Sequence, residues 1–354
     1  MGKLESDKRA AVLRRTYLDK RKYLTTMTGL TVILIVVVMA SLVLGRFNLS
    51  IIDAVKIAFS PLFPIRVTWD GTMEAVIFKL RLPRICAAAL VGGALAVSGA
   101  SYQSMFKNPM VSPDILGVSS GAALGASLAI FWGLGQNIIQ LWAFIGGIAA
   151  VTLTAMVPKM MKSSSAIILV LAGIVVGGLM TSLMGILRYF ADPETALAEM
   201  VYWSMGSFAD IRKADLISMA PGIILCAAVL LLIRYRLNVL SLGENEAKTL
   251  GLNIRQTRGV IIVCSTLMTA ASVCMAGTIG WVGLVIPHLG RMLVGPDNRR
   301  MLPASLIMGS AFMVIIDTLA RTLTAAELPI SIITGIIGAP FYLYLLLKQR
   351  TRIQ

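Results

Sequence analysis

Charged residues are scarce in this sequence. Asp, Glu, Lys and Arg make up 14% of its 354 residues, whereas a soluble domain of this size carries about a quarter. There is one histidine, His288, which cannot form a metal cluster by itself. Each of the four cysteines lies in an apolar stretch and none forms a C-x-x-C pair, so we interpret them as small buried side chains. We therefore expect no metal site and no cofactor.

Motifs for energy conversion and for covalent chemistry are also missing. The sequence has no G-x-x-x-x-G-K-[ST] phosphate loop and no nucleophile elbow. Asp317 is the only acid well inside an apolar stretch, and Arg321 follows it four residues later, on the same helix face. A proton- or sodium-driven carrier usually needs buried acids along its pathway. An ion-gradient carrier remains the alternative, but we expect the energy for transport to come from a partner; a membrane enzyme has little support.

Apolar residues dominate instead: they make up 57% of the chain, and the mean hydropathy is +0.83. A helix needs about 20 such residues to cross a hydrocarbon core of about 30 Å. Two charge-free runs are too long for one helix and divide at glycine-containing turns. We predict an all-α integral membrane protein with ten transmembrane helices, at residues 24–45, 85–106, 115–133, 136–158, 163–187, 216–233, 259–277, 283–294, 301–323 and 328–347.

The basic residues fit this topology. The net charge is +15, and eight Lys or Arg residues precede the first apolar stretch. With residues 1–23 as a basic cytoplasmic tail, 22 of the 32 Lys and Arg residues fall on the inner side, as the positive-inside rule requires. We predict a multi-pass membrane protein with both termini cytoplasmic. Nucleic acid is not an expected partner, because the basic residues lie between apolar spans and no reading module is present.

Two segments outside the spans, 46–84 and 191–213, contain both acids and aromatic residues. Aromatic residues near span ends are usually anchors at the membrane interface. We therefore expect short helices that lie at the outer surface.

The largest inner loop, 238–252, contains a short predicted helix. Gly243 and Gly251 bracket this helix, and its first turn is acidic, as the helix dipole favours. Leu242 and Leu250 would be exposed apolar side chains, which suggest a protein contact. From these residues alone, docking of a partner and resting on the membrane are equally good interpretations.

Glycines recur every four residues in two predicted spans, at 117–125 and 173–177. Such spacing lets helix backbones approach closely. We favour helix packing over direct contact with a substrate.

Several ordered motifs resemble one family over roughly residues 25–350. The sequence is similar to permease subunits of the ABC importers for iron–siderophores, haem and cobalamin, the FecCD type. Ser331 departs from the family pattern, in which glycine is usual, and we expect a local packing change there. The matching motifs are Arg81-Leu-Pro-Arg84, Gly92-Gly-Ala-Leu-Ala-Val-Ser-Gly99, Asn108-Pro109, Pro113-Asp-Ile-Leu-Gly-Val-Ser-Ser-Gly-Ala122, Leu242-Gly-Glu244, Gly280-Trp-Val-Gly-Leu-Val-Ile-Pro-His288, Asp317-Thr-Leu-Ala-Arg321 and Glu327-Leu-Pro329.

The resemblance implies a type II ABC importer permease fold over residues 24–354. It implies a homodimer in the lipid bilayer of a prokaryotic plasma (inner) membrane, with the pathway on the two-fold axis. Two ATP-binding-cassette ATPase subunits would bind inside, and an extracytoplasmic solute-binding protein would dock outside. The cargo would be a ferric siderophore or a related metal chelate such as haem or cobalamin. The chain itself would carry out no catalysis.

The resemblance also implies roles for particular residues. Two of the arginines to which it assigns docking of the binding protein also have another interpretation. Arg84 could be an anchor whose side chain snorkels to the membrane surface, and Arg321 could be neutralised by Asp317. The ATPase-coupling residues would be Leu240, Leu242, Gly243, Glu244, Ala247, Leu250 and Gly251. The arginines for docking of the binding protein would be Arg81, Arg84 and Arg321. The pathway helix and inner gate would include Ser163, Ser164, Ser165, Gly173 and Gly177.

Overall fold

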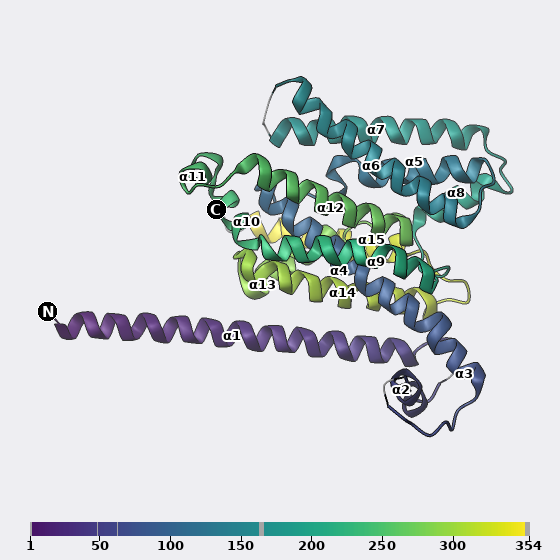
Figure 1. Ribbon diagram of the computed structural model, residues 1–354, viewed down its shortest axis with the longest axis horizontal. Helices are drawn as coiled ribbons and strands as arrows, with labels where there is room; N and C mark the ends of the chain where they lie inside the picture. Colours follow the sequence, from purple (N-terminus) through teal and green to yellow (C-terminus); the bar gives the residue numbers. More distant parts are fainter. Residues whose placement is uncertain (1, 48, 62, 163–165, 351–354) are drawn as a thin grey trace.

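The computed structural model describes residues 2–47, 49–61, 63–162 and 166–350, and this part of the chain contains helices and no strand. Most of the helices run roughly parallel or antiparallel in one bundle (Figure 1). The long helices are α1 (Gly2–Val43), α4 (Leu82–Phe106), α6 (Gln136–Met160), α7 (Ala166–Phe190), α9 (Lys213–Leu232), α12 (Ile254–Ala276), α14 (Asn298–Thr322) and α15 (Ile330–Arg350). The shorter ones are α2 (Ile51–Phe59), α3 (Gly71–Ala75), a π-helical turn (Val76–Arg81), a 3-10 turn (Pro113–Leu116), α5 (Val118–Phe131), α8 (Ala196–Met205), α10 (Arg234–Leu242), α11 (Glu244–Thr249) and α13 (Val282–Val294).

Seven helical segments in the described chain are long and apolar enough to cross a membrane, and each overlaps a predicted span. Three shorter apolar helices, α5, α13 and the first part of α15, coincide with the other three predicted spans. At 1.5 Å per residue, the 13 to 14 residues of α5 and α13 extend about 20 Å, less than a hydrocarbon core. The multi-pass architecture is thus established, and the count of ten remains a prediction.

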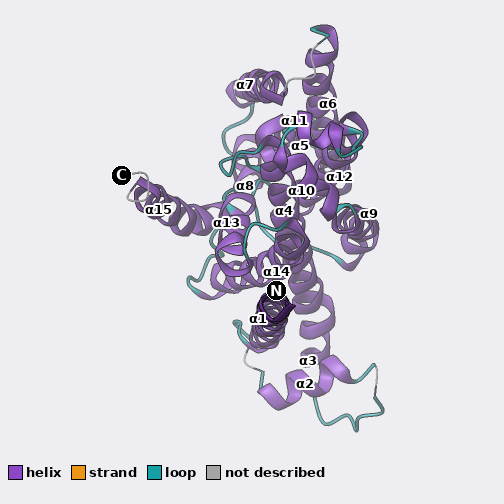
Figure 2. Ribbon diagram, turned by 90° about the vertical axis from the view of Figure 1, so that its left-hand side faces the viewer, coloured by secondary structure: helices purple, strands orange, loops and turns teal. Residues whose placement is uncertain are grey.

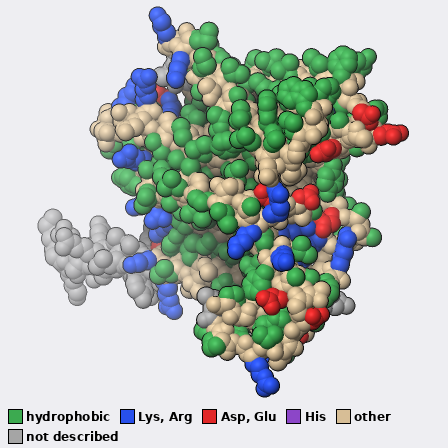
Figure 3. All heavy atoms as spheres, turned by 45° about the vertical axis from the view of Figure 1, so that its right-hand side comes forward, with side chains coloured by type: hydrophobic (Ala, Val, Ile, Leu, Met, Phe, Trp, Pro, Cys, Tyr) green, Lys and Arg blue, Asp and Glu red, His purple; other side chains and the backbone are tan. Residues whose placement is uncertain are grey.

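Helix α4 is the centre of the bundle. In the apolar window of Gly71–Phe106, 83% of residues are buried, against 11% in that of α1. Helices α9, α12, α13 and α14 pack around α4, whereas α1 lies against α14 at the edge (Figure 2). Apolar side chains cover most of the upper surface in Figure 3, with charged side chains along its left and right edges, as expected for a bundle inserted in lipid.

The two segments outside the spans only partly match expectation. Helix α2 is one of the expected short helices, but Gly71–Arg81 continues directly into α4 as a single helical run. A short helix at the outer surface was expected here, yet Ile77 and Arg81 are buried. In the second segment α8 packs against α5 and α15, and Met200 and Phe208 are buried in the interior. These helices therefore belong to the protein core as well as to its surface.

Glycines allow several helix pairs to touch through their backbones. A Cβ on Gly99 of α4 would lie 2.0 Å from the carbonyl oxygen of Gly283 in α13. A Cβ on Gly173 of α7 would lie 2.1 Å from the carbonyl oxygen of Ile115. Gly177, one turn further along α7, lies over Gly117. The glycine stripes therefore pack helices, as their spacing predicts.

Gly99→Ala should lower the free energy of unfolding by about 1–3 kcal/mol, because its Cβ would meet backbone that cannot rotate away. Gly259→Ala in α12 is the matched control: nothing lies within 4 Å of its Cβ, so helix propensity should raise stability by about 0.5–1 kcal/mol. Thermal unfolding of the detergent-purified variants measures both. Equal stability of the two variants would contradict backbone contact between α4 and α13.

Candidate functional site

The bundle has two ends that carry different structures. At one end lie α10 and α11, together with the start of α1 and the end of α15; we call this the α11 end (Figure 1). The opposite end carries α2, α3 and α8, and we call it the α8 end (Figure 1). The predicted ATPase-coupling residues lie at the α11 end and the predicted docking arginines near the α8 end.

The predicted docking arginines belong to a buried charge cluster, formed by Arg81, Arg84, Asp317, Arg321 and Glu327. Asp317 has no exposed surface, and Arg84 Nε donates to its Oδ1 at 2.8 Å. Arg321 Nε lies 3.9 Å from Asp317 Oδ2 on the same helix, as the i, i+4 spacing predicts. Arg84 Nη1 also lies 2.9 Å from Glu327 Oε2, so one arginine connects α4, α14 and the loop before α15. Asp317 is thus an ion-paired acid held between two cations.

Two arginines of this cluster close the C-terminal end of α1. Arg81 Nη1 donates to the carbonyls of Leu42 and Val43, and its Nη2 donates to that of Phe47 at 2.6 Å. Arg321 Nη2 donates to the Ser41 carbonyl and, at 2.8 Å, to the Ser41 hydroxyl. The last carbonyls of a helix lack intrahelical donors and carry partial negative charge, so a cation there is favourable. These contacts hold α1 against α4 and α14.

All three arginines are therefore used inside the chain. Arg81, Arg84 and Arg321 are 5%, 9% and 7% exposed. Arg84 does not snorkel to the surface, because two carboxylates hold it. Glu327 is the most accessible member of the charge cluster, with 27% of its side chain exposed. A docking role for these arginines stays a prediction, and in the present conformation it would require Arg84 to leave Glu327.

Hydrogen bonds from other parts of the chain hold the loop between α14 and α15 in place. Arg46 donates to the carbonyls of Thr324 and Ala325, and Leu328 N donates to Ala320 O at 3.0 Å. The first residue of α15, Ile330, donates through its backbone N–H to Gly206 O at the end of α8, at 3.0 Å. The start of α15 therefore depends on contacts from both α8 and the charge cluster.

At the α11 end, α10 and α11 form a compact pair with a buried base and an exposed apolar top. Leu240 and Ala247 are buried, whereas Leu242 is 61% and Leu250 63% exposed. Glu244 Oε1 accepts from Arg258 of α12 at 2.6 Å. This pair thus rests on its own bundle and leaves two leucines free for a contact.

Glycines shape both ends of α11. Gly243 (φ 151°) and Gly251 (φ 77°) adopt backbone conformations that are unfavourable for residues other than glycine. The predicted bracketing of the helix by these two residues is therefore observed.

Helix α10 is tied to the centre of the bundle by a chain of polar contacts. Asn238 Nδ2 donates to Asp297 at 2.6 Å, and its Oδ1 accepts from the backbone N–H of Asn298 at 2.8 Å. Ser104 of α4 donates to the Asn298 side chain at 2.8 Å. Movement of α10 would therefore be transmitted to α14 and α4.

Asp297 also caps α14. Burial opposes its ionisation, but hydrogen bonds from the Asn238 side chain and from the backbone and side chain of Arg299 hold the pKa of Asp297 below its ordinary value. Sequence reasoning missed this site. An acid just before a predicted helix is a usual start signal, whereas no local pattern indicates the contact with Asn238, 59 residues away.

The predicted inner gate, Ser163, Ser164 and Ser165, lies outside the described residues. The pathway residues Gly173 and Gly177 make the packing contacts already described, and their role along a pathway stays a prediction. No group of three or more His, Cys, Asp or Glu in the described chain could hold a metal ion.

A family model, the FecCD transport family, matches residues 33–348. The chain belongs to the FecCD transport family. The family inferred from the sequence motifs is confirmed, and the chain is an ABC importer permease, a multi-pass membrane transport subunit. Relatives of this FecCD permease show how widely the family's cargo varies.

The molybdate import system permease protein MolB of Haemophilus influenzae is 39% identical over 91% of this chain and 95% of its own. The hemin transport system permease protein HmuU of Yersinia pestis is 37% identical, covering 92% and 96%. A solved structure described as a metal-chelate type ABC transporter in an inward-facing conformation is 38% identical, with a TM-score of 0.82 and coverage of 92% and 99%. The cargoes for which these relatives are named differ, so membership of the family alone does not select one for this chain.

Proposed function

We propose that this FecCD permease imports a ferric siderophore or a related metal chelate, as a homodimer driven by two ATPase subunits. The α11 end would face the cytoplasm and receive the ATPases. The α8 end would receive a solute-binding protein. This orientation is supported by the positive-inside rule, because 22 of the 32 Lys and Arg residues fall in segments that the predicted topology assigns to the inner side.

The observation that carries the proposal is the α10–α11 pair. Leu242 and Leu250 are exposed on a buried base, and Asn238 ties that base to α14 and α4. Such a device suits a partner that pushes on one end of the bundle. Asp317, in contrast, is held between two arginines, which makes the ion-gradient alternative weaker.

Uptake by proteoliposomes tests this function. The permease is reconstituted with the ATPase and the solute-binding protein encoded beside it, and radiolabelled ferric siderophore is offered at the binding-protein side. We expect uptake to require ATP, to stop in an ATPase variant that binds but does not hydrolyse ATP, and to continue when ionophores collapse all ion gradients. Uptake that survives without ATP hydrolysis would contradict the ATP-driven mechanism.

The same vesicles test the cargo. Haem, cobalamin and molybdate are offered in parallel with the ferric siderophore, because relatives are named for haem, cobalamin and molybdate. We expect a metal chelate to be transported and molybdate not to be. Uptake of molybdate alone would contradict the chelate assignment and leave the ATP-driven mechanism standing.

A further inference from the structure

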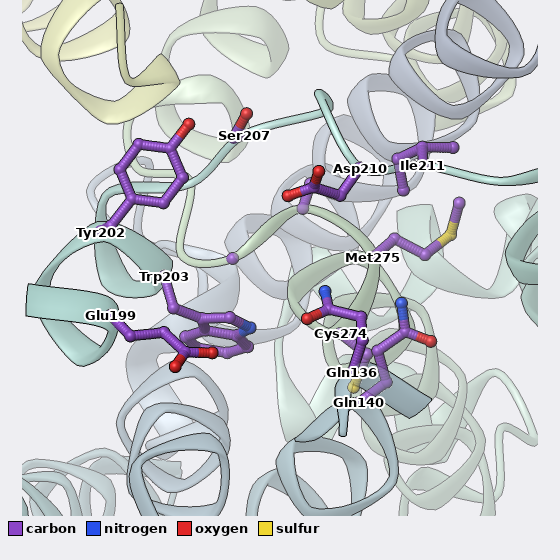
Figure 4. A pocket seen from close by; sticks show the side chains of 12 residues that line it. Gln136, Gln140, Glu199, Tyr202, Trp203, Ser207, Asp210, Ile211, Cys274 and Met275 are labelled. Atoms are coloured by element: carbon purple, nitrogen blue, oxygen red, sulfur yellow. The ribbon is translucent and has the colours of Figure 1, made fainter. Parts of the chain in front are cut away.

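A cavity of about 110 Å³ lies at the α8 end, separate from the charge cluster and from the α10–α11 pair. It is formed where the start of α6, the helix α8, the segment before α9 and the end of α12 meet. Figure 4 shows Gln136 and Gln140 from α6 on one side, Glu199 and Trp203 from α8 on another, and Asp210 above them.

Three polar side chains of this cavity, those of Gln140, Glu199 and Asp210, have no hydrogen-bond partner in the described chain. Gln140 is 8% exposed, its amide faces the cavity in Figure 4, and it makes no hydrogen bond within the described chain. Glu199 and Asp210 are exposed carboxylates at the cavity, and neither forms an ion pair or hydrogen bond with any described residue. The amide of Gln140 therefore presents unused donors and an unused acceptor to an occupant of the cavity.

The cavity is also negatively charged. Its lining contains two acids and no Lys or Arg. Of the basic residues close to these acids in sequence, Arg188 donates to Ser204 at 2.9 Å and Arg212 contacts Asp215 and Asn137. Lys213 is exposed and does not line the cavity. The occupant that fits is a cation.

The shape and chemistry of the lining narrow the kind of cation. Two carboxylates, amide oxygens and the indole of Trp203 together favour an ammonium or guanidinium group, through charged hydrogen bonds and a cation–π contact. A bare metal ion does not fit, since no group of three ligating side chains is present in the described chain. A cavity of this volume suits one side chain and is too small for a metal chelate.

We propose that this cavity receives a Lys or Arg side chain of the solute-binding protein. The inference rests on the proposed function, in which that protein docks at the α8 end. Charge complementarity selects the occupant, because the cavity presents two unpaired carboxylates where the charge cluster presents arginines that are already paired.

The cavity lies beside backbone contacts that an occupant would affect. Ser207 N donates to Ala276 O at 3.0 Å, which joins α8 to the end of α12 beside the cavity. Gly206 O, one residue earlier, accepts from the first residue of α15. A side chain inserted between α6, α8 and α12 would therefore act on the contact that positions the start of α15.

The test measures the affinity of the solute-binding protein for the complete permease–ATPase complex in lipid nanodiscs. The double variant Glu199→Gln, Asp210→Asn should bind roughly tenfold or more weakly, with a smaller dependence on salt. Glu74→Gln, Glu194→Gln is the matched control, since it removes two exposed acids at the same end outside the cavity. The control should stay within about twofold of the wild type.

Rescue by charge exchange gives a second measurement. Each surface Lys and Arg of the binding protein is changed to Glu, and one such change should restore binding to a Glu199→Lys permease. Equal affinity of the two double variants, or quenching of Trp203 fluorescence by n-butylammonium without any effect on docking, would overturn the proposal. Failure of the wild-type complex to bind the protein at all would instead contradict the proposed function.

Discussion

Asp317→Asn should lower the free energy of unfolding by about 3–5 kcal/mol, because it leaves buried arginines without their counter-charge. Arg84 would lose its contact of 2.8 Å with Asp317, and Arg321 would lose its only carboxylate ion pair among the described residues. Both arginines also hold other helices, so α1 and the loop before α15 should loosen together. Thermal and denaturant unfolding of the detergent-purified protein measure the effect.

Glu327→Gln is the control for this prediction. Glu327 is partly exposed and contacts Arg84 alone, which keeps Asp317 as its partner, so the loss should be about 1 kcal/mol. The pair of variants also separates two mechanisms. An acid that carries a coupling ion would tolerate amidation structurally and lose transport coupling, whereas a structural ion pair loses stability first. Normal stability of the Asp317 variant would contradict the structural role.

The double variant Leu242→Ala, Leu250→Ala should weaken attachment of the ATPase by about 2 kcal/mol, roughly 30-fold in affinity, and should reduce ATP-driven uptake. Both side chains are more than half exposed, so their truncation removes contact area without opening a core cavity. Co-purification of the ATPase and uptake by proteoliposomes measure the two effects.

Leu232→Ala is the matched control, since Leu232 is 82% exposed near the end of α9 and lies outside the α10–α11 pair. It should leave both ATPase attachment and uptake unchanged. If the double variant retained the ATPase as well as this control does, the leucines would not be the docking contact, and the alternative that α10 and α11 rest on the membrane would be favoured.

The short helix between Gly243 and Gly251 shows what a local pattern predicts well. Glycine positions, acids in a first turn and exposed leucines are properties of adjacent residues, and α11 forms where they indicate. The apolar spans are equally local, because each is a run of consecutive residues. The segment 71–81 shows the limit: a short surface helix was expected, yet the segment runs into α4, and Arg81 is buried with carbonyl partners in α1 and just after it.

The charge cluster could not be derived from spacing alone. The i, i+4 rule paired Asp317 with Arg321, and that contact exists at 3.9 Å, but the closer partner is Arg84, 233 residues away. The arginines can be buried only because acceptors from distant parts of the chain bind their N–H groups. The unpartnered Gln140 is likewise visible only once α6, α8 and α12 are assembled.

The sequence by itself determined the membrane class, the family and the position of α11, because composition, ordered motifs and helix-ending glycines are encoded in consecutive residues. Only the tertiary structure decided which arginines are buried, which glycines touch backbone and where a cavity remains. These depend on groups brought together from distant parts of the chain, and a buried charge or a close backbone contact is stable only when its partner is in place.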